Sequence, residues 1–422
     1  MHPDPRGITV EGDLRPPLPI NEPVLSYVAG SPERAELKAT LDMMASEVID
    51  IPVIVGGKDI LTGDTADVVM PHDHGHVLAR YHKAAPEHIQ AAIDTGHEAW
   101  HEWSNWPWQD RAAVLLRAAD LLAGPWRATL NASTMLGQSK TVYQAEIDAA
   151  CEIIDFWRFN VQYARELYAQ QPISSPGLWN YMDYRPLEGF IYAISPFNFT
   201  SIGGNLPTAP ALMGNVAIWK PARTSLYSSY FLMRLLQEAG LPDGVINFLP
   251  GNSAQISDLL IKSPHLAGIH FTGSTAVFQS LWKDVAANLE NYRSYPRIVG
   301  ETGGKDFIVA HESADPDVLV TAMIRGAFEY QGQKCSAASR AYIPESMWPE
   351  VKQKLGEELA TVKMGDPREF ENFVCAVIDG SAYRDITSFI DHAKASPDAE
   401  ILFGGNYSDE KGFFIEPTVI LA

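Results

Sequence analysis

Cysteine is scarce in this sequence, which has three cysteines among 422 residues. An odd and sparse set, Cys151, Cys335 and Cys375, excludes the dense disulfide framework of small secreted domains and suits a reducing compartment. The first residues, Met-His-Pro-Asp-Pro-Arg-Gly, contain neither an apolar segment nor an excess of Arg and Ser, so no signal or transit peptide is expected. We therefore predict a cytoplasmic protein.

Long apolar runs and an excess of positive charge are also missing. No run approaches the ~20 residues that a membrane-spanning helix needs, so no membrane partner is expected. The chain carries 32 Lys and Arg against 52 Asp and Glu, a net charge of −20. Because nucleic-acid phosphates are bound by basic surfaces, this balance argues against a nucleic-acid partner. The net negative charge does not exclude a small anionic ligand, since a single binding site can be locally positive.

The two commonest glycine-rich phosphate-binding motifs are absent as well. The sequence contains no G-x-G-x-x-G and no G-x-x-x-x-G-K-[ST]. A nucleotide is not excluded, because a helix N-terminus at the carboxyl edge of a parallel sheet can face a pyrophosphate without either motif. The run Phe271-Thr272-Gly273-Ser274-Thr275 fits such a turn, although by itself it is an ordinary helix N-cap.

What the sequence does contain is a regular alternation of apolar runs and helical stretches. Strands are expected at 190–195, 216–220, 245–250 and 268–272, with helices between them. This order predicts βαβ units and a parallel sheet that is buried on both faces. A second α/β series begins near Pro296, in line with the two or three domains that this length requires. One long helix is expected from about Lys140 to Tyr168.

Four polar residues in Gly- or Pro-marked settings could carry thiol-based carbonyl chemistry. Cys335 lies in Gln-Gly-Gln-Lys-Cys-Ser-Ala and could attack a carbonyl as a thiolate. Glu301, beside Gly303 and Gly304, could activate water, and the Asn198 amide could stabilise an oxyanion. Taken singly, each has an ordinary alternative: a buried structural cysteine, a solvated loop carboxylate and a turn asparagine.

The order and spacing of four runs resemble the aldehyde dehydrogenase superfamily and, within it, the Δ1-pyrroline-5-carboxylate dehydrogenases. The runs are 195–222, 270–274, 295–307 and 328–337, and the resemblance extends from about Asn21 to the end of the chain. It implies an aldehyde dehydrogenase-like α/β fold with an N-terminal arm (1–30), a parallel-sheet NAD-binding domain (31–300), a projecting oligomerisation hairpin (about 170–187) and a second α/β catalytic domain (301–422). Family members continue beyond the position of Ala422, so the catalytic domain is expected to be C-terminally incomplete.

The resemblance also implies the reaction, an NAD-dependent oxidation of L-glutamate γ-semialdehyde to L-glutamate in proline catabolism. Cys335 would form a thiohemiacetal and then a thioester, Asn198 would bind the oxyanion, and Glu301 would activate the hydrolytic water. The residues expected to bind NAD are Ser195, Pro196, Phe197, Lys220, Gly273, Ser274, Thr275, Glu301 and Gly303. The residues expected to bind the substrate are Glu152 at its ammonium, Phe199 at its stem, Ser336 at its carboxylate and the nearby cation Lys334.

Further expectations concern selectivity, metals and assembly. Arg223 stands where the family often has an acidic or neutral residue, so NADP is less firmly excluded than usual. The run His72-Asp73-His74-Gly75-His76 alternates like metal ligands, but no functional metal is expected. A homodimer or a higher homo-oligomer is implied.

Two alternatives to this function stay open. The first is an enzyme of the same scaffold acting on another aldehyde, or an acyl-phosphate or acyl-CoA reductase, although a hydrolytic Glu301 argues against the reductases. The second is a truncated, non-catalytic cofactor-binding homologue.

Overall fold

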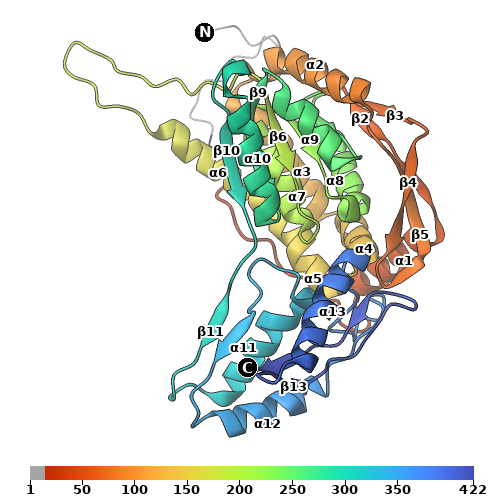
Figure 1. Cartoon of the computed structure of the whole chain (residues 1–422). Coiled ribbons are helices and arrows are strands. Elements are labelled where there is room, and N and C mark those ends of the chain that lie inside the picture. The colour runs from red at the N-terminus through yellow and green to blue at the C-terminus, as the bar shows by residue number, and fades with distance from the viewer. Residues whose placement is uncertain (1–14) are drawn as a thin grey trace.

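The computed structural model of the protein describes residues 15–422, and these form two lobes (Figure 1). The first lobe contains a large sheet covered by helices, and the chain leaves it through β10 (Arg297–Glu301) to enter the second lobe. Residues 1–14 of the predicted N-terminal arm lie outside the described part. Residues 15–28 form no helix or strand. No helix among residues 15–422 is long and apolar enough to cross a membrane.

The central sheet has seven strands in the order β10-β9-β6-β7-β8-β2-β3. The five strands from β10 to β8 run parallel, whereas β2 and β3 are antiparallel additions. Four of the parallel strands lie where the alternating sequence predicts them. Strand β10 was expected to open the second series near Pro296 but instead pairs with β9 at the edge of this sheet. Besides β10, the strands are β9 (Leu266–Thr272), β6 (Phe190–Ile194), β7 (Val216–Lys220), β8 (Ile246–Phe248), β2 (Val53–Val55) and β3 (Lys58–Ile60).

Alternating side chains of the inner strands β6 and β7 enter two separate cores. In β6, Phe190 and Tyr192 belong to one apolar cluster, and Ile191 and Ala193 belong to the other. This period of two follows from the pleat and buries both faces of the sheet. The helices on the first face are α2 (Pro86–Trp103), α9 (Ser253–Lys262) and α10 (Thr275–Ala287), and those on the second include α3 (Trp108–Ala123), α4 (Arg127–Gln138), α7 (Thr200–Leu212) and α8 (Leu226–Glu238).

A three-stranded sheet stands beside the large one, in the order β1-β5-β4. Its strands are β1 (Ile49–Ile51), β5 (Asp73–His82) and β4 (Thr65–Met70). Helix α1 (Pro32–Ser46) precedes it, and the Ser31 hydroxyl accepts a hydrogen bond from the Arg34 amide at its N-terminus, as expected for an N-cap.

The long helix predicted from about Lys140 to Tyr168 is present as a continuous helical run over 142–169, but it is not α-helical throughout. The segment consists of α5 (Val142–Ala145), a π-helical turn η1 (Glu146–Cys151) and α6 (Glu152–Ala169). The buried Glu146 carboxylate accepts hydrogen bonds from the Leu25 amide and the Tyr27 hydroxyl, both at 2.8 Å, and pairs with Arg127. These distant partners stabilise the wide turn, a feature that is frequent at functional sites.

The predicted projecting segment is present after α6, but it is not a β-hairpin. Figure 1 shows it extending far from the first lobe, and residues 170–187 contain no strand. Its two arms are joined through side chains instead: the Gln171 amide group bonds the backbone of Met182, and Asn180 bonds Ser174 and Ile173.

The second lobe is a small α/β unit. Strands β11 (Phe307–Val309) and β12 (Arg340–Tyr342) pair in parallel, and helices α11 (Pro316–Phe328) and α12 (Trp348–Leu359) pack on each other over a small apolar core. Helix α13 (Gly380–Ala395) lies between this core and the first lobe (Figure 1). Two antiparallel pairs follow: β13 (Glu400–Phe403) with β16 (Val419–Leu421), and β14 (Tyr407–Ser408) with β15 (Phe414–Ile415).

Candidate active site

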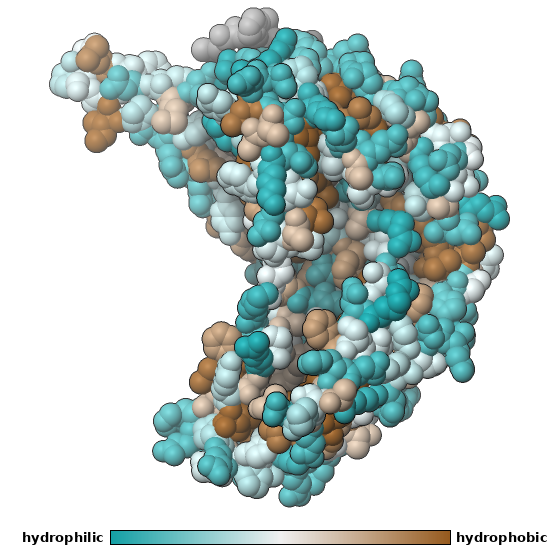
Figure 2. Space-filling model, viewed as in Figure 1, coloured by the Kyte–Doolittle hydropathy of each residue, from teal (hydrophilic) through white to brown (hydrophobic). Residues whose placement is uncertain are grey.

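The predicted site residues of the first lobe gather at the carboxyl edge of the parallel sheet. Ile194 is in register with Lys220 on one side and with Phe271 on the other, and Thr272 is in register with Glu301. The residues that end or follow these strands therefore meet at one edge, where open α/β sheets bind their ligands. Figure 2 shows the molecule hollowed between its two lobes, and this edge faces the second lobe.

Cys335 lies on the loop that follows α11 and contacts Glu301. Burial is the main cause that raises the pKa of the Cys335 thiol, and a hydrogen bond to the Glu301 carboxylate raises it further. A hydrogen bond from the Ser336 backbone amide lowers the pKa of the thiol and so partly opposes these two effects. In the resting site the thiol is therefore protonated near neutral pH, and the carboxylate beside it can accept its proton.

The nucleophile loop is held in an unusual backbone conformation. Tyr330 and Gln331 have φ of 50° and 56°, and each such residue costs of order 1–3 kcal/mol unless the surroundings enforce it. The buried Tyr330 hydroxyl donates to the Gln138 carbonyl at 3.0 Å, and the Gln331 amide donates to the Ala376 carbonyl at 2.7 Å. The Ile378 amide in turn donates to the Gln333 side chain at 2.9 Å. These clamping residues were missed in the sequence because their partners are distant in the chain.

Two further contacts join the nucleophile loop to Asn198 and Gly304. The Asn198 amide donates to the carbonyl of Gln333 at 2.9 Å, two residues before the thiol. A Cβ atom on Gly304 would lie 1.5 Å from the carbonyl oxygen of Cys335, so only glycine fits there. The structure thus brings Cys335, Glu301 and Asn198 together, as expected, and adds Gly304 as a residue that permits the contact.

The predicted nucleotide turn fits a dinucleotide. Gly273 donates its amide to the Glu301 carbonyl at 3.1 Å, and a Cβ there would strike the Phe271 ring at 2.7 Å. The Ser274 hydroxyl caps α10, which starts with the exposed Thr275, and Gly303 borders open space. A helix N-terminus with close backbone approach is an anion site that suits a pyrophosphate.

Lys220 strengthens that fit. Its side chain is buried at the end of β7, and it forms no hydrogen bond or ion pair with another of the described residues 15–422. Burial, with a smaller effect of Arg223, lowers the pKa of Lys220 to about 8. A buried ammonium without a protein partner is suited to ligand hydroxyls.

Three further predicted cofactor residues form hydrogen bonds within the protein. The Ser195 hydroxyl accepts a hydrogen bond from the Trp219 indole at 3.0 Å, so its side chain points into the core. The Pro196 carbonyl accepts from the Ser225 hydroxyl, and the Phe197 carbonyl accepts from the Gln138 amide. These residues shape the loop that presents Asn198.

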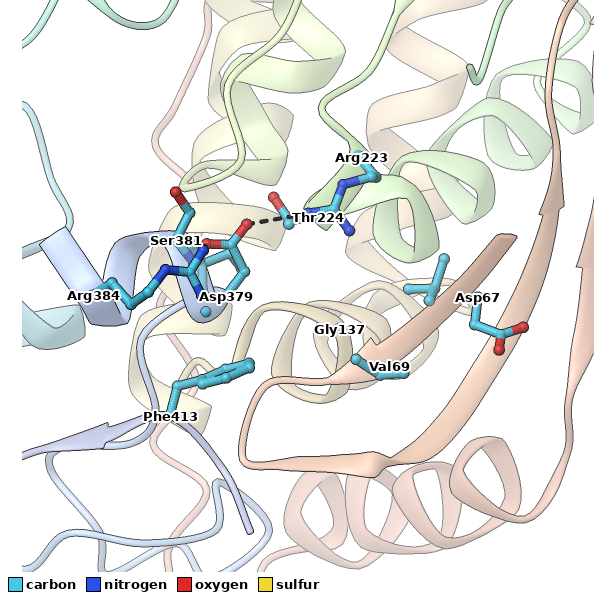
Figure 3. Close-up of a pocket in the computed structure, with 12 residues that line it drawn as sticks. Asp67, Val69, Gly137, Arg223, Thr224, Asp379, Ser381, Arg384 and Phe413 are labelled. Carbon is cyan, nitrogen blue, oxygen red and sulfur yellow. Dashed lines mark hydrogen bonds and ion pairs between the residues drawn. The ribbon is translucent and has the colours of Figure 1, made fainter. Parts of the chain in front are cut away.

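Arg223 lies in a pocket of about 310 Å³ between β4, α4 and the start of α13 (Figure 3). Its guanidinium pairs with Asp379 at 3.2 Å, and Arg384 points into the same pocket. The arginine is thus shared with a carboxylate that also caps α13. An incoming 2′-phosphate would compete with this ion pair.

One of the predicted substrate residues, Glu152, lines a second cavity. A cavity of about 670 Å³ is lined by residues of η1 and α6, including Asp148 and Glu152. The Ser201 hydroxyl donates to Glu152 at 2.6 Å, and burial raises the pKa of that carboxyl. Phe199 is buried nearby, and Ser336 is exposed. Lys334 pairs with Asp148 at 3.0 Å, so it does not face water as an isolated charge would.

The remaining candidates of the sequence have structural roles. Cys151 and Cys375 are buried free thiols. His74 and His76 hydrogen-bond the carbonyls of Asp409 and Ala45, each at 2.8 Å. Among residues 15–422 no group of His, Cys, Asp or Glu is placed to hold a metal ion.

Comparison with known proteins decides the family. The model of the aldehyde dehydrogenase family matches residues 61–422, which is most of the chain. The chain belongs to the aldehyde dehydrogenase family. Curated relatives within this family include the mitochondrial Δ1-pyrroline-5-carboxylate dehydrogenases of Dictyostelium discoideum, 52% identical over 409 residues, and of Homo sapiens, 49% identical over 401 residues. These matches cover 96% and 95% of this chain and 73% and 71% of the relatives.

Solved structures of aldehyde dehydrogenases agree with the fold. The Δ1-pyrroline-5-carboxylate dehydrogenase of Mycobacterium tuberculosis bound with NAD superposes with a TM-score of 0.96 at 53% identity, over 97% of this chain and 77% of that one. The 1-pyrroline-5-carboxylate dehydrogenase from Thermus with bound NAD gives a TM-score of 0.89 at 29% identity, over 98% and 78%. The predicted aldehyde dehydrogenase fold is therefore confirmed.

Proposed function

We propose that this aldehyde dehydrogenase oxidises L-glutamate γ-semialdehyde, the open form of Δ1-pyrroline-5-carboxylate, to L-glutamate with NAD, as a step of proline catabolism. The observation that carries the proposal is the meeting of Cys335, Glu301 and Asn198 at one sheet edge. It occurs in a chain about half identical to several Δ1-pyrroline-5-carboxylate dehydrogenases.

The first half of the mechanism is attack on the aldehyde. Glu301 accepts the hydrogen bond of the Cys335 thiol and can take its proton, which produces the nucleophilic thiolate. The thiolate attacks the aldehyde carbon, and the oxygen that gains negative charge receives hydrogen bonds from the Asn198 amide and the Cys335 backbone amide. The Asn198 amide, which donates to Gln333 in the resting site, turns to the oxyanion for this step.

The second half is oxidation and hydrolysis. Lys220 and the turn at Gly273 and Ser274 would hold NAD, which would supply the hydride acceptor for oxidation of the Cys335 adduct to a thioester. After the proton that it took from the thiol has passed to solvent, Glu301 takes a proton from a water molecule, and the resulting hydroxide attacks the thioester and releases the carboxylic acid and the Cys335 thiolate. Gly303, two residues after Glu301, borders open space, and we infer that this connection lets Glu301 turn from the thiol to the water.

A Cys335→Ala variant tests this function. Turnover of glutamate γ-semialdehyde with NAD should fall to background in an NADH absorbance assay, while NAD still binds, because the thiol contributes only to the chemistry. Cys375→Ala, which removes a buried thiol elsewhere, is the control and should keep its activity. Residual dehydrogenase activity of Cys335→Ala above background would contradict the assignment.

Substrate rates separate the remaining alternatives. The proposed enzyme should oxidise glutamate γ-semialdehyde far faster than propanal, because Glu152 and Lys334 offer charges to an amino-acid end. Equal rates would favour a general aldehyde dehydrogenase, and no oxidation of either would favour a cofactor-binding homologue.

We also propose a homodimer or higher homo-oligomer and a cytoplasmic location. The projecting segment supports the former, since Ile173 and Trp179 are 91% and 88% exposed on it, and large exposed apolar side chains mark interfaces. The three free cysteines support the latter, because they suit a reducing compartment.

A further inference from the structure

A buried charge network lies behind the nucleophile loop, and its centre is Asp148. This residue belongs to the π-helical turn η1, and one of its carboxylate oxygens, Oδ2, contacts two lysines. The Lys140 ammonium lies 2.8 Å from it, and the Lys334 ammonium lies 3.0 Å from it. Asp148 thus bridges two cations, one of which is the neighbour of Cys335.

Lys140 is a counter-ion that cannot reach solvent or substrate. Its side chain is fully buried, and its ammonium lies 4.6 Å from the centre of the Phe199 ring and 4.4 Å from that of Tyr330. Aromatic faces and one carboxylate replace the water that such a charge loses. Because the cation is fixed there, it holds the Asp148 carboxylate in one place.

Lys334 has two carboxylates within reach. Asp148, which lines the cavity of about 670 Å³, lies 3.0 Å from its ammonium. Glu329 lies 3.7 Å from it and already pairs with Arg325. In its present position the Lys334 ammonium is 5.7 Å from the Phe199 ring, where the stem of the substrate is expected.

Glu152 lines the same cavity as Asp148. Its carboxylate is bonded to Ser201 and interacts electrostatically with Asp148, Lys140 and Lys334. An amino-acid end carries an ammonium and a carboxylate side by side, so a site with one anion and one cation at fixed positions complements it. The anion is fixed by Ser201, and the cation is fixed by Asp148.

We propose that Asp148, held by the buried Lys140, is a positioning residue that sets Lys334 to receive the α-carboxylate of the substrate. Selectivity for amino-acid aldehydes then depends on a residue that need not touch the reacting atoms. The inference rests on the proposed function, because it assigns Lys334 to the substrate.

The first experiment compares two aldehydes in Asp148→Asn. For glutamate γ-semialdehyde, KM should rise about 10-fold or more while kcat changes less than about 3-fold. The reason is that the variant loses the charge-assisted contact by which Asp148 holds Lys334 in place. For propanal, which has no carboxylate, kcat/KM should stay within about 2-fold. Glu329→Gln, which removes the other carboxylate near Lys334, is the matched control and should leave both substrates unchanged.

Folding must be separated from positioning, because Asp148→Asn leaves the buried Lys140 charge unpaired. The double variant Lys140→Met, Asp148→Asn replaces the pair by neutral groups of similar volume, and such replacements are tolerated in protein cores. It should melt near the wild-type temperature and still show the raised KM for glutamate γ-semialdehyde. A wild-type KM in this folded variant would overturn the inference.

A double-mutant cycle decides whether Asp148 acts through Lys334. Lys334→Met should raise the same KM, and adding Asp148→Asn to it should cause little further change, since the two act as one unit. Additive effects, or equal losses with both aldehydes, would overturn the positioning role. A wild-type enzyme that shows no preference for glutamate γ-semialdehyde would instead contradict the proposed function.

Discussion

The thiol of Cys335 and the carboxylate of Glu301 share a hydrogen bond, which raises the pKa of the thiol. Replacing Glu301 by Gln removes a negative charge that raises the pKa of Cys335, although burial, the larger cause, remains. The thiolate fraction at pH 8 should therefore rise, and iodoacetamide should alkylate Cys335 about 3- to 10-fold faster, since one pKa unit changes the fraction tenfold. The rate of alkylation as a function of pH measures this.

The same Glu301→Gln variant should lose its hydrolytic base. Loss of a general base costs about 10²- to 10⁴-fold, so a burst of NADH should precede a slow steady rate. No burst, together with an unchanged steady rate, would count against the role of Glu301 in deacylation.

Arg223 is the residue at which cofactor selectivity can be tested. It is 59% exposed and pairs with Asp379. Arg223→Glu should weaken NADP several-fold at low salt through repulsion of the 2′-phosphate and change the affinity for NAD less than about 2-fold. Arg384→Glu, on α13 in the same pocket, is the control (Figure 3). Equal changes in the KM of both cofactors would refute a role for Arg223 in selectivity.

At the scale of elements, the turn between β4 and β5 is packed against the second lobe through His72. This side chain is fully buried, and neither ring nitrogen has a hydrogen-bond partner among residues 15–422; Asp366 lies 3.6 Å away. Burial lowers the pKa of His72 to about 4, with Arg368 and Lys411 acting in the same direction and Asp366 and Asp73 opposing it. The neutral imidazole is thus the form that fits the folded protein.

The consequence is a pH-dependent stability of the packing between the lobes. Because the pKa of His72 is lowered in the folded state, its contribution to the free energy of unfolding is complete above its pKa in the unfolded chain, about 6.5. This contribution falls by about 3 kcal/mol as the pH falls toward 4. His72→Gln, which stays neutral, should give a flatter plot of unfolding free energy between pH 6.5 and 4. A denaturation series with the same slope in both proteins would contradict this.

Sequence patterns predicted those elements whose cause is local. Apolar runs between Gly and Pro located four of the five parallel strands. The π-helical turn η1 was not predictable, because it depends on what Glu146 bonds at positions 25, 27 and 127 rather than on its own neighbours. For the same reason Cys335, Glu301 and Asn198 were found by motif, whereas the clamp formed by Gln138, Gln331 and Gln333 was not.

At the scale of the whole molecule, the projecting segment predicts the assembly. The wild-type protein should exceed the 46.5 kDa of one chain by about a factor of two or more in light scattering. The double variant Ile173→Asp, Trp179→Asp places charges on the exposed segment and should shift the mass toward one chain. Leu61→Asp, at another exposed apolar residue, is the control and should not shift it. A wild-type protein of single-chain mass would contradict the oligomer.

The far edge of the large sheet has a consequence for synthesis on the ribosome. Strands β2 and β3 are translated early, but Ile54 pairs with Phe248, and the Gly56 amide bonds the Asn247 side chain 191 residues later. At a typical ~5–20 residues per second, this interval lasts ~10–40 s. During that time Val53 and Val55 lack the sheet that buries them in the complete protein. Nascent chains halted before Asn247 should therefore be the ones that recruit chaperones at this hairpin.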